Sequence, residues 1–275
     1  MSVTSGTGMR ARGYGTAGPS VLVLHGGPGA PGYVAPVARG LARSFRVLEP
    51  WQRGSGSGPL TVARHVDDLE DLIVSRCEGE RPAIVGHSFG AMLALAHAAA
   101  HATSAGPLVL IGCGTFDRRA RDRLRAIREA RMDEGLRRRL ERLPLEFPDP
   151  DARLRRLGKL MLQIDSFELA SLGDRVEVYD ARANEETWED MLRLQEEGVY
   201  PAAFAAIDAP VLMLHGAFDP HPGQMIRTSL ASYLPQLEYH EWERCGHYPW
   251  LEKAVRDEFR VVLHDWLARH MHVVG

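Results

Sequence analysis

The chain has 275 residues, of which 45% are hydrophobic and 25% are charged, and its formal net charge at pH 7 is −3. This balance is typical of a globular protein and argues against nucleic acid or an anionic membrane as the main partner. No apolar stretch approaches the length of a membrane span, and residues 1–6 lack the charged and apolar segments of a signal peptide. Cys77, Cys113 and Cys245 are too scattered for a disulfide framework or a zinc site, so we predict a reducing, cytoplasmic environment.

Short apolar runs alternate with helical or glycine-rich segments over the first 114 residues. Val21–Leu24 is apolar throughout, which is typical of a strand buried on both faces of a parallel sheet. In chain order the expected elements are an edge strand at 9–14, strands at 21–24, 45–48, 83–85 and 108–111, and helices at 33–42, 62–73 and 91–96. Strands that alternate with helices predict a parallel sheet with helices on both faces.

The pattern changes between residues 115 and 206. This segment has helical periodicity and no buried strand, and its last helix is expected to begin behind Asn184 as the N-cap. The alternation then resumes with strands at 211–214 and 237–242 and with helices at 224–233 and 250–270. The predicted fold class is α/β, a mostly parallel doubly wound sheet with an inserted all-helical lid. Residues 1–114 and 207–275 form the core, and residues 115–206 form the lid.

The charge of the predicted lid is uneven. Residues 118–159 contain fifteen Lys or Arg and eight Asp or Glu, a net charge of about +7. Residues 160–200 contain three Arg and eleven Asp or Glu, a net charge of about −8. Either these are solvated helix faces that attract one another, or some of the acids face the pocket and bind a cationic group of the substrate.

Gly86–Gly90 reads G-H-S-F-G and lies between an expected strand and an expected helix. This order is the context of a nucleophile elbow, in which a strained turn exposes the hydroxyl of Ser88 at the edge of the sheet. Side chains at Gly86 and Gly90 would collide with the neighbouring strand and helix. The N-terminus of the helix directs its amides at negative charge that develops near Ser88.

A serine hydroxyl is a weak nucleophile and needs a base, which in turn needs an orienting group. Asp219 follows the expected strand at 211–214, and His247 follows the expected strand at 237–242. The chain order Ser88, Asp219, His247 is that of α/β-hydrolase triads. We therefore predict that Ser88 attacks, that His247 moves the proton and that Asp219 orients His247.

The oxyanion that forms on attack needs two backbone donors. We expect the amide of Phe89 to supply one and that of Gly27, in the loop after the first buried strand, to supply the other. His25 in the same loop is interpreted as a structural hydrogen-bonding residue, and Cys245 as a packed thiol. No set of residues has the spacing of metal ligands, so neither a metal nor another cofactor is expected.

The core resembles the α/β-hydrolase fold, and three motifs resemble the proline iminopeptidase branch of that superfamily. They are the H-G-G-P-G loop at 25–29, the Q-R-G-S-G loop at 52–56 and the G-H-Y-P-W-L-E stretch at 246–252. The chain departs from that branch at two places. It has Trp51 where the loop of that branch begins with Asp, and its elbow reads G-H-S-F-G where G-G-S-W-G is usual in that branch. Lid acids that bind the free amine of the substrate are what the resemblance further implies.

The predicted function is a cofactor-independent serine hydrolase that acts on a small ester, amide or short peptide bond. The alternatives are an aminopeptidase of the proline iminopeptidase type and a non-catalytic ligand-binding protein on this fold. The residues expected to contact the substrate are Trp51, Trp188, Glu185 and Glu189. The partner is a small molecule or short peptide, and the sequence leaves the oligomeric state open.

Overall fold

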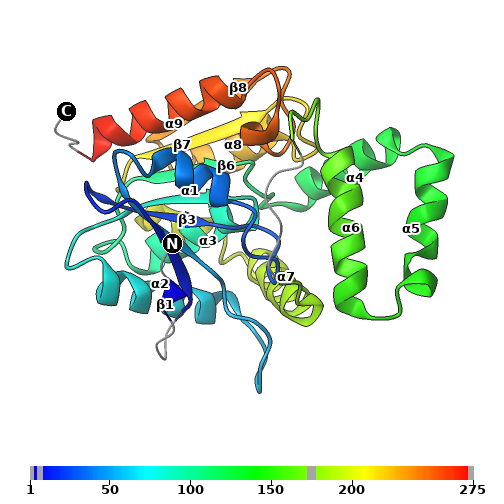
Figure 1. The fold of residues 1–275 in the computed structure, drawn as a ribbon, viewed down its shortest axis with the longest axis horizontal. Helices are drawn as coiled ribbons and strands as arrows, with labels where there is room; N and C mark the ends of the chain where they lie inside the picture. The colour runs from blue at the N-terminus through cyan, green and yellow to red at the C-terminus, as the bar shows by residue number, and fades with distance from the viewer. Residues whose placement is uncertain (1–2, 5–8, 172–177, 272–275) are drawn as a thin grey trace.

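The computed structural model describes residues 3–4, 9–171 and 178–271; most of residues 1–8, on which the expectation about a signal peptide depends, lies outside them. Within these residues eight strands form one sheet in the order β1-β2-β4-β3-β5-β6-β7-β8 (Figure 1). The strands are β1 (Val3–Thr4), β2 (Ala11–Tyr14), β3 (Ser20–Leu24), β4 (Arg46–Pro50), β5 (Ala83–His87), β6 (Leu108–Ile111), β7 (Val211–Gly216) and β8 (Leu237–Trp242). From β4 to β8 every pair is parallel, whereas β2 pairs antiparallel with β1 and β4.

Helices cover both faces of the sheet, as predicted. On one face, Leu22 and Leu24 of β3 pack in a core with α2 (Val62–Arg76), α3 (Phe89–Ala100) and α8 (Gly223–Ala231). On the other face, Val21 and Val23 pack in a core with α1 (Ala35–Leu41) and α9 (Arg256–His270). Because successive side chains of a strand point to opposite faces, a strand covered on both sides must be apolar at every position. The α/β fold class is confirmed.

Between β6 and β7 the described residues form four α-helices and a short 3-10 helix. They are α4 (Arg118–Arg131), α5 (Glu134–Glu146), α6 (Pro150–Ile164), α7 (Ala181–Glu196) and η1 (Ala202–Ala206). Figure 1 shows α4, α5 and α6 projecting from one side of the sheet, with α7 closer to the body of the molecule. Over the described ranges, no helix is long and apolar enough to cross a membrane.

Several helix boundaries differ from the expectation by a few residues, and the starts of α7 and α9 have a local cause. Asn184 is not the N-cap of α7, because the helix begins at Ala181 and the carboxylate of Asp180 accepts the amide of Ala183 at 2.9 Å. Asn184 instead donates its side-chain amide to the carbonyl of Pro28. The terminal helix α9 begins at Arg256 rather than at residue 250, since the 3-10 helix η2 (Pro249–Leu251) precedes it.

The acids of α7 bind backbone amides. Asp180, Glu186 and Asp190 accept the amides of Ser55, Leu60 and Val62, respectively, at 2.7–2.9 Å. The acidic segment therefore anchors α7 to the glycine-rich loop after β4 and to the first residue of α2. Neither interpretation of the lid charge, solvated faces or substrate binding, describes these three carboxylates.

Candidate active site

Ser88 occupies a strained turn between β5 and α3. Its φ of +54° and ψ of −118° lie in a region that residues with a side chain rarely adopt. A Cβ on Gly86 would lie 2.2 Å from the carbonyl oxygen of Gly90, and a Cβ on Gly90 would lie 2.6 Å from that of Leu24. Neither approach is tolerable, so this backbone requires glycine at both positions, as the motif predicts.

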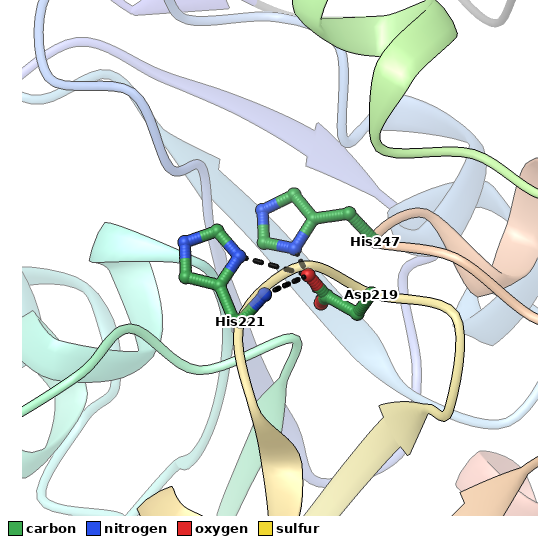
Figure 2. A group of neighbouring side chains, drawn as sticks. All are labelled: Asp219, His221 and His247. Carbon is green, nitrogen blue, oxygen red and sulfur yellow. Dashed lines mark hydrogen bonds and ion pairs between the residues drawn. The ribbon is translucent and has the colours of Figure 1, made fainter. Parts of the chain in front are cut away.

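His247 and Asp219 form a buried hydrogen-bonded pair (Figure 2). Nδ1 of His247 lies 2.6 Å from Oδ2 of Asp219, and both residues are less than 5% exposed. A carboxylate oxygen only accepts, so Nδ1 of His247 carries the proton and Nε2 presents its lone pair. Asp219 follows β7 and His247 follows β8, the strand ends at which the sequence predicts them.

His221 is a second histidine on the same carboxylate. Its Nδ1 and its backbone amide lie 2.8 and 2.9 Å from Oδ1 of Asp219. Its ring stacks on that of His247, with centroids 4.4 Å apart and an interplanar angle of 17° (Figure 2). His221 is not among the residues predicted from the sequence. The pattern that indicates it is the D-x-H spacing, because an Asp side chain readily accepts a hydrogen bond from the amide two residues ahead.

Burial and neighbouring charged groups determine the protonation states of Asp219 and His221. Burial by itself raises the pKa of Asp219, but the surrounding His247, His221 and His215 outweigh it and hold that pKa well below its usual value. Burial lowers the pKa of His221 to about 4, although Asp219 opposes that shift. At neutral pH the site therefore contains an ionised carboxylate next to a neutral His221.

His87 connects the loop of His247 to the glycine-rich loop after β3. Its Nε2 lies 2.9 Å from the carbonyl oxygen of His247, so this nitrogen carries the proton. Its Nδ1 then accepts the hydroxyl of Tyr33 at 2.7 Å, and the same hydroxyl accepts the amide of Gly26 at 2.8 Å. Burial lowers the pKa of His87 well below its usual value, which keeps this arrangement neutral.

Two arginines of α4 support the backbone around the paired residues, one directly and one through Asp165. Arg128 forms two hydrogen bonds with the buried carboxylate of Asp165, whose carbonyl accepts the amide of His247 at 2.8 Å. Arg131 donates to the carbonyl of Phe218, the residue before Asp219, at 2.6 Å. The inserted helices thereby help to position the backbone on either side of the site.

Glu252 closes the loop of His247 from the other side. Its fully buried carboxylate accepts the amides of Gly246, Phe167 and Glu168 at 2.7–2.8 Å. One side chain therefore ties the residue before His247 to the segment that leaves α6. Three hydrogen bonds to an ionised group are worth more than the same number to a neutral group.

We expect Glu252→Gln to lower the free energy of unfolding by about 2–3 kcal/mol, because an amide presents N–H to at least one of these donors. Urea denaturation monitored by circular dichroism measures the change. Glu141→Gln, on the exposed surface of α5, is the control and should change stability by less than about 0.5 kcal/mol. Equal effects of the two substitutions would contradict the role assigned to Glu252.

The two expected oxyanion residues belong to different elements. Phe89 is the first residue of α3, and Gly27 is half-buried in the loop after β3 with a φ of +49°. The ring of Trp188 on α7 packs edge-on against that of Phe89, with centroids 5.4 Å apart. His25 is structural as interpreted, since its Nε2 accepts the amide of Gln52 and burial lowers its pKa to about 4.

Glu185, Glu189 and Trp51 are the other residues expected to contact the substrate, and that role stays a prediction. Glu185 and Glu189 are exposed on α7, about half a turn away from the buried Thr187. Trp51 directly follows β4, with the guanidinium groups of Arg10 and Arg12 over its ring. Cys245 is buried, and burial raises the pKa of its thiol, as expected for a packed residue.

Asp219, His221 and His247 also form a group that could hold a metal ion, with ligand atoms within 4.8 Å of one another in the described part of the chain. Each oxygen of Asp219 already accepts an imidazole N–H, and Nδ1 of both histidines is used in doing so. Hydrogen bonding therefore accounts for the cluster. That the protein uses no metal stays a prediction.

A model of the alpha/beta hydrolase family matches residues 21–259, which is most of the chain. The chain belongs to the alpha/beta hydrolase family. A search of curated proteins found no match to this hydrolase. The sheet order, with the elbow after β5 and the paired residues after β7 and β8, agrees with the family assignment.

Solved structures of low sequence identity share this fold. A thermophilic esterase from Thermogutta terrifontis is 20% identical with a TM-score of 0.64, covering 98% of this chain and 97% of that chain. VinJ is 19% identical with a TM-score of 0.69, covering 98% of each. A monoacylglycerol lipase from Paleococcus ferrophilus is 17% identical with a TM-score of 0.60, covering 95% and 99%. None of these comparisons supports the proline iminopeptidase branch that three loop motifs predicted.

Proposed function

We propose that this protein is a serine hydrolase that cleaves small carboxylic esters through an acyl-enzyme on Ser88. The observation that carries the proposal is the 2.6 Å hydrogen bond from Nδ1 of His247 to the buried Asp219. This bond selects the tautomer in which Nε2 of His247 can accept a proton. The strained turn at Ser88, the esterase and lipase descriptions of structurally similar proteins and the family assignment all support it.

In the acylation step, Nε2 of His247 takes the proton of the Ser88 hydroxyl while Oγ bonds to the carbonyl carbon of the ester. The amides of Gly27 and Phe89 donate to the oxyanion, and the N-terminus of α3 adds its positive end. His247 then returns the proton to the leaving alkoxide, the carbon–oxygen bond breaks and an alcohol departs. Asp219 remains ionised throughout and stabilises protonated His247.

Deacylation repeats these steps with water as the nucleophile. Nε2 of His247 takes a proton from water, whose oxygen bonds to the acyl carbon. The proton then passes to Oγ of Ser88 as the acyl–oxygen bond breaks and a carboxylic acid leaves. Ester plus water thus gives alcohol plus acid, with no other reactant.

A fluorophosphonate probe and two chromogenic substrates test the proposal together. We expect the probe to label Ser88 in the folded protein, as peptide mapping would show, and p-nitrophenyl butyrate to be hydrolysed with higher kcat/KM than proline-β-naphthylamide. The carboxylates of Asp180, Glu186 and Asp190 already bind backbone amides, which leaves them poorly placed to bind a substrate ammonium group.

The two alternatives give different outcomes. An aminopeptidase would prefer the free-amine substrate and would lose that preference when Glu185 and Glu189, two exposed acids of α7, are replaced by glutamine. A non-catalytic binding protein would neither take up the probe at Ser88 nor hydrolyse either substrate.

A further inference from the structure

The carboxylate of Asp219 receives more donors than a catalytic triad requires. Oδ2 accepts Nδ1–H of His247, while Oδ1 accepts both the ring Nδ1–H and the backbone N–H of His221. A carboxylate without the second set of donors can rotate and share either oxygen with His247. Three directional hydrogen bonds leave Asp219 a single orientation.

A third histidine, His215, fixes the backbone of His221. Nε2 of the buried His215, on β7, donates to the carbonyl of His221 at 2.8 Å and lies 3.5 Å from Oδ2 of Asp219. The loop from β7 to α8 is therefore closed on itself by His215, Asp219 and His221. These contacts place the His221 ring parallel to His247, 4.4 Å from it (Figure 2).

The charged and titratable groups around His221 come from several elements. Asp219 and His215 belong to β7 and its following loop, His247 to the loop after β8, and Arg128 to α4. Arg128 and His247 both disfavour a charged His221, whereas Asp219 favours it; burial is the largest influence, and the pKa is about 4. His221 is therefore a neutral donor over the pH range in which His247 would act as a base.

We propose that His221 is a positioning residue that holds Oδ1 of Asp219 and so keeps Oδ2 on Nδ1 of His247. The inference rests on the proposed function, because it assigns His221 a role through the catalytic base. The ring donor also disperses the negative charge on the Asp219 carboxylate, the group that would stabilise a positive charge on the imidazole during catalysis.

Two variants of His221 distinguish the effect of its Nδ1–H hydrogen bond from the effect of its stacking on His247. In His221→Asn, the side-chain amide places an N–H near the position of Nδ1; in His221→Phe, an aromatic ring can still stack on His247 but donates nothing. We expect the acid limb of the kcat/KM profile for p-nitrophenyl butyrate to stay unchanged in the Asn variant. In the Phe variant it should move up by about half a pH unit, with a plateau about fivefold lower. Acid limbs that coincide in the two variants would overturn the proposal.

A measurement on the unsubstituted protein tests the hydrogen bond from His221 to Asp219 even if the Phe variant does not fold. In ¹⁵N-histidine-labelled protein at pH 7, NMR should show His221 neutral and protonated at Nδ1, because this nitrogen donates to Asp219. A His221 ring protonated at Nε2 would overturn the proposal. This measurement needs no turnover, so a protein that hydrolyses no ester would refute the proposed function alone.

Discussion

Ser88→Ala should hydrolyse p-nitrophenyl butyrate at least about a thousandfold more slowly than the unsubstituted protein, because it lacks the hydroxyl proposed to form the acyl-enzyme. The fold should persist. The described residues offer the Ser88 side chain no hydrogen bond, its backbone amide still donates to the carbonyl of Ile111, and alanine is strained by a φ of +54° no more than serine is. Initial rates and thermal unfolding measure the two quantities on the same preparation.

The matched control is Ser232→Ala, an exposed serine at the end of α8, which should retain full activity. A Ser88→Ala protein that kept more than about a tenth of the normal rate would contradict the mechanism. Cys245 would then be the next residue to replace, since it lies two positions before His247.

Asp219→Asn is expected to lower kcat by about ten-thousandfold. An Asn side chain has one acceptor oxygen where the carboxylate has two. Because His221 directs two N–H groups at Oδ1 and His247 directs one at Oδ2, the amide oxygen should turn toward His221 and the NH₂ toward His247. Nδ1 of His247 must then accept, its proton moves to Nε2, and that nitrogen can no longer take a proton from Ser88.

Steady-state kinetics with p-nitrophenyl butyrate measures this loss, and Asp208→Asn, at an exposed position, serves as its control. Circular dichroism should show that the Asn variant is folded, because a neutral group of the same shape fills the buried site. A variant with more than about a hundredth of the normal kcat would show that Asp219 does not select the tautomer of His247.

Local sequence patterns were sufficient to predict the fold. A strand such as Val21–Leu24 is apolar at every position because two helical layers cover it, and that pattern is visible without coordinates. The nucleophile elbow could also be predicted from the sequence. Its glycines are required, since Gly86 and Gly90 face backbone atoms at distances that leave no room for a Cβ. Two glycines that flank a serine at this spacing, directly after a buried strand, are typical of a nucleophile elbow.

The proposed triad could also be read from chain order, because the ends of parallel strands meet at one edge of the sheet. Asp219 and His247 each follow a buried strand, and the structure brings them within hydrogen-bonding distance. The acids of the inserted helices could not be assigned in the same way. Whether Glu186 faces a substrate, the solvent or the amide of Leu60, 126 residues earlier, depends on how α7 packs.

The amino-acid sequence by itself therefore determined most of the strands and helices and the elbow, because each depends on neighbours within a few positions of the chain, and it also gave the order of the residues proposed for catalysis. Only the tertiary structure revealed that His221 stacks on His247 and that Glu252 ties Gly246 to the exit of α6. Such contacts join separate loops, and their geometry exists only after the sheet has brought those loops together.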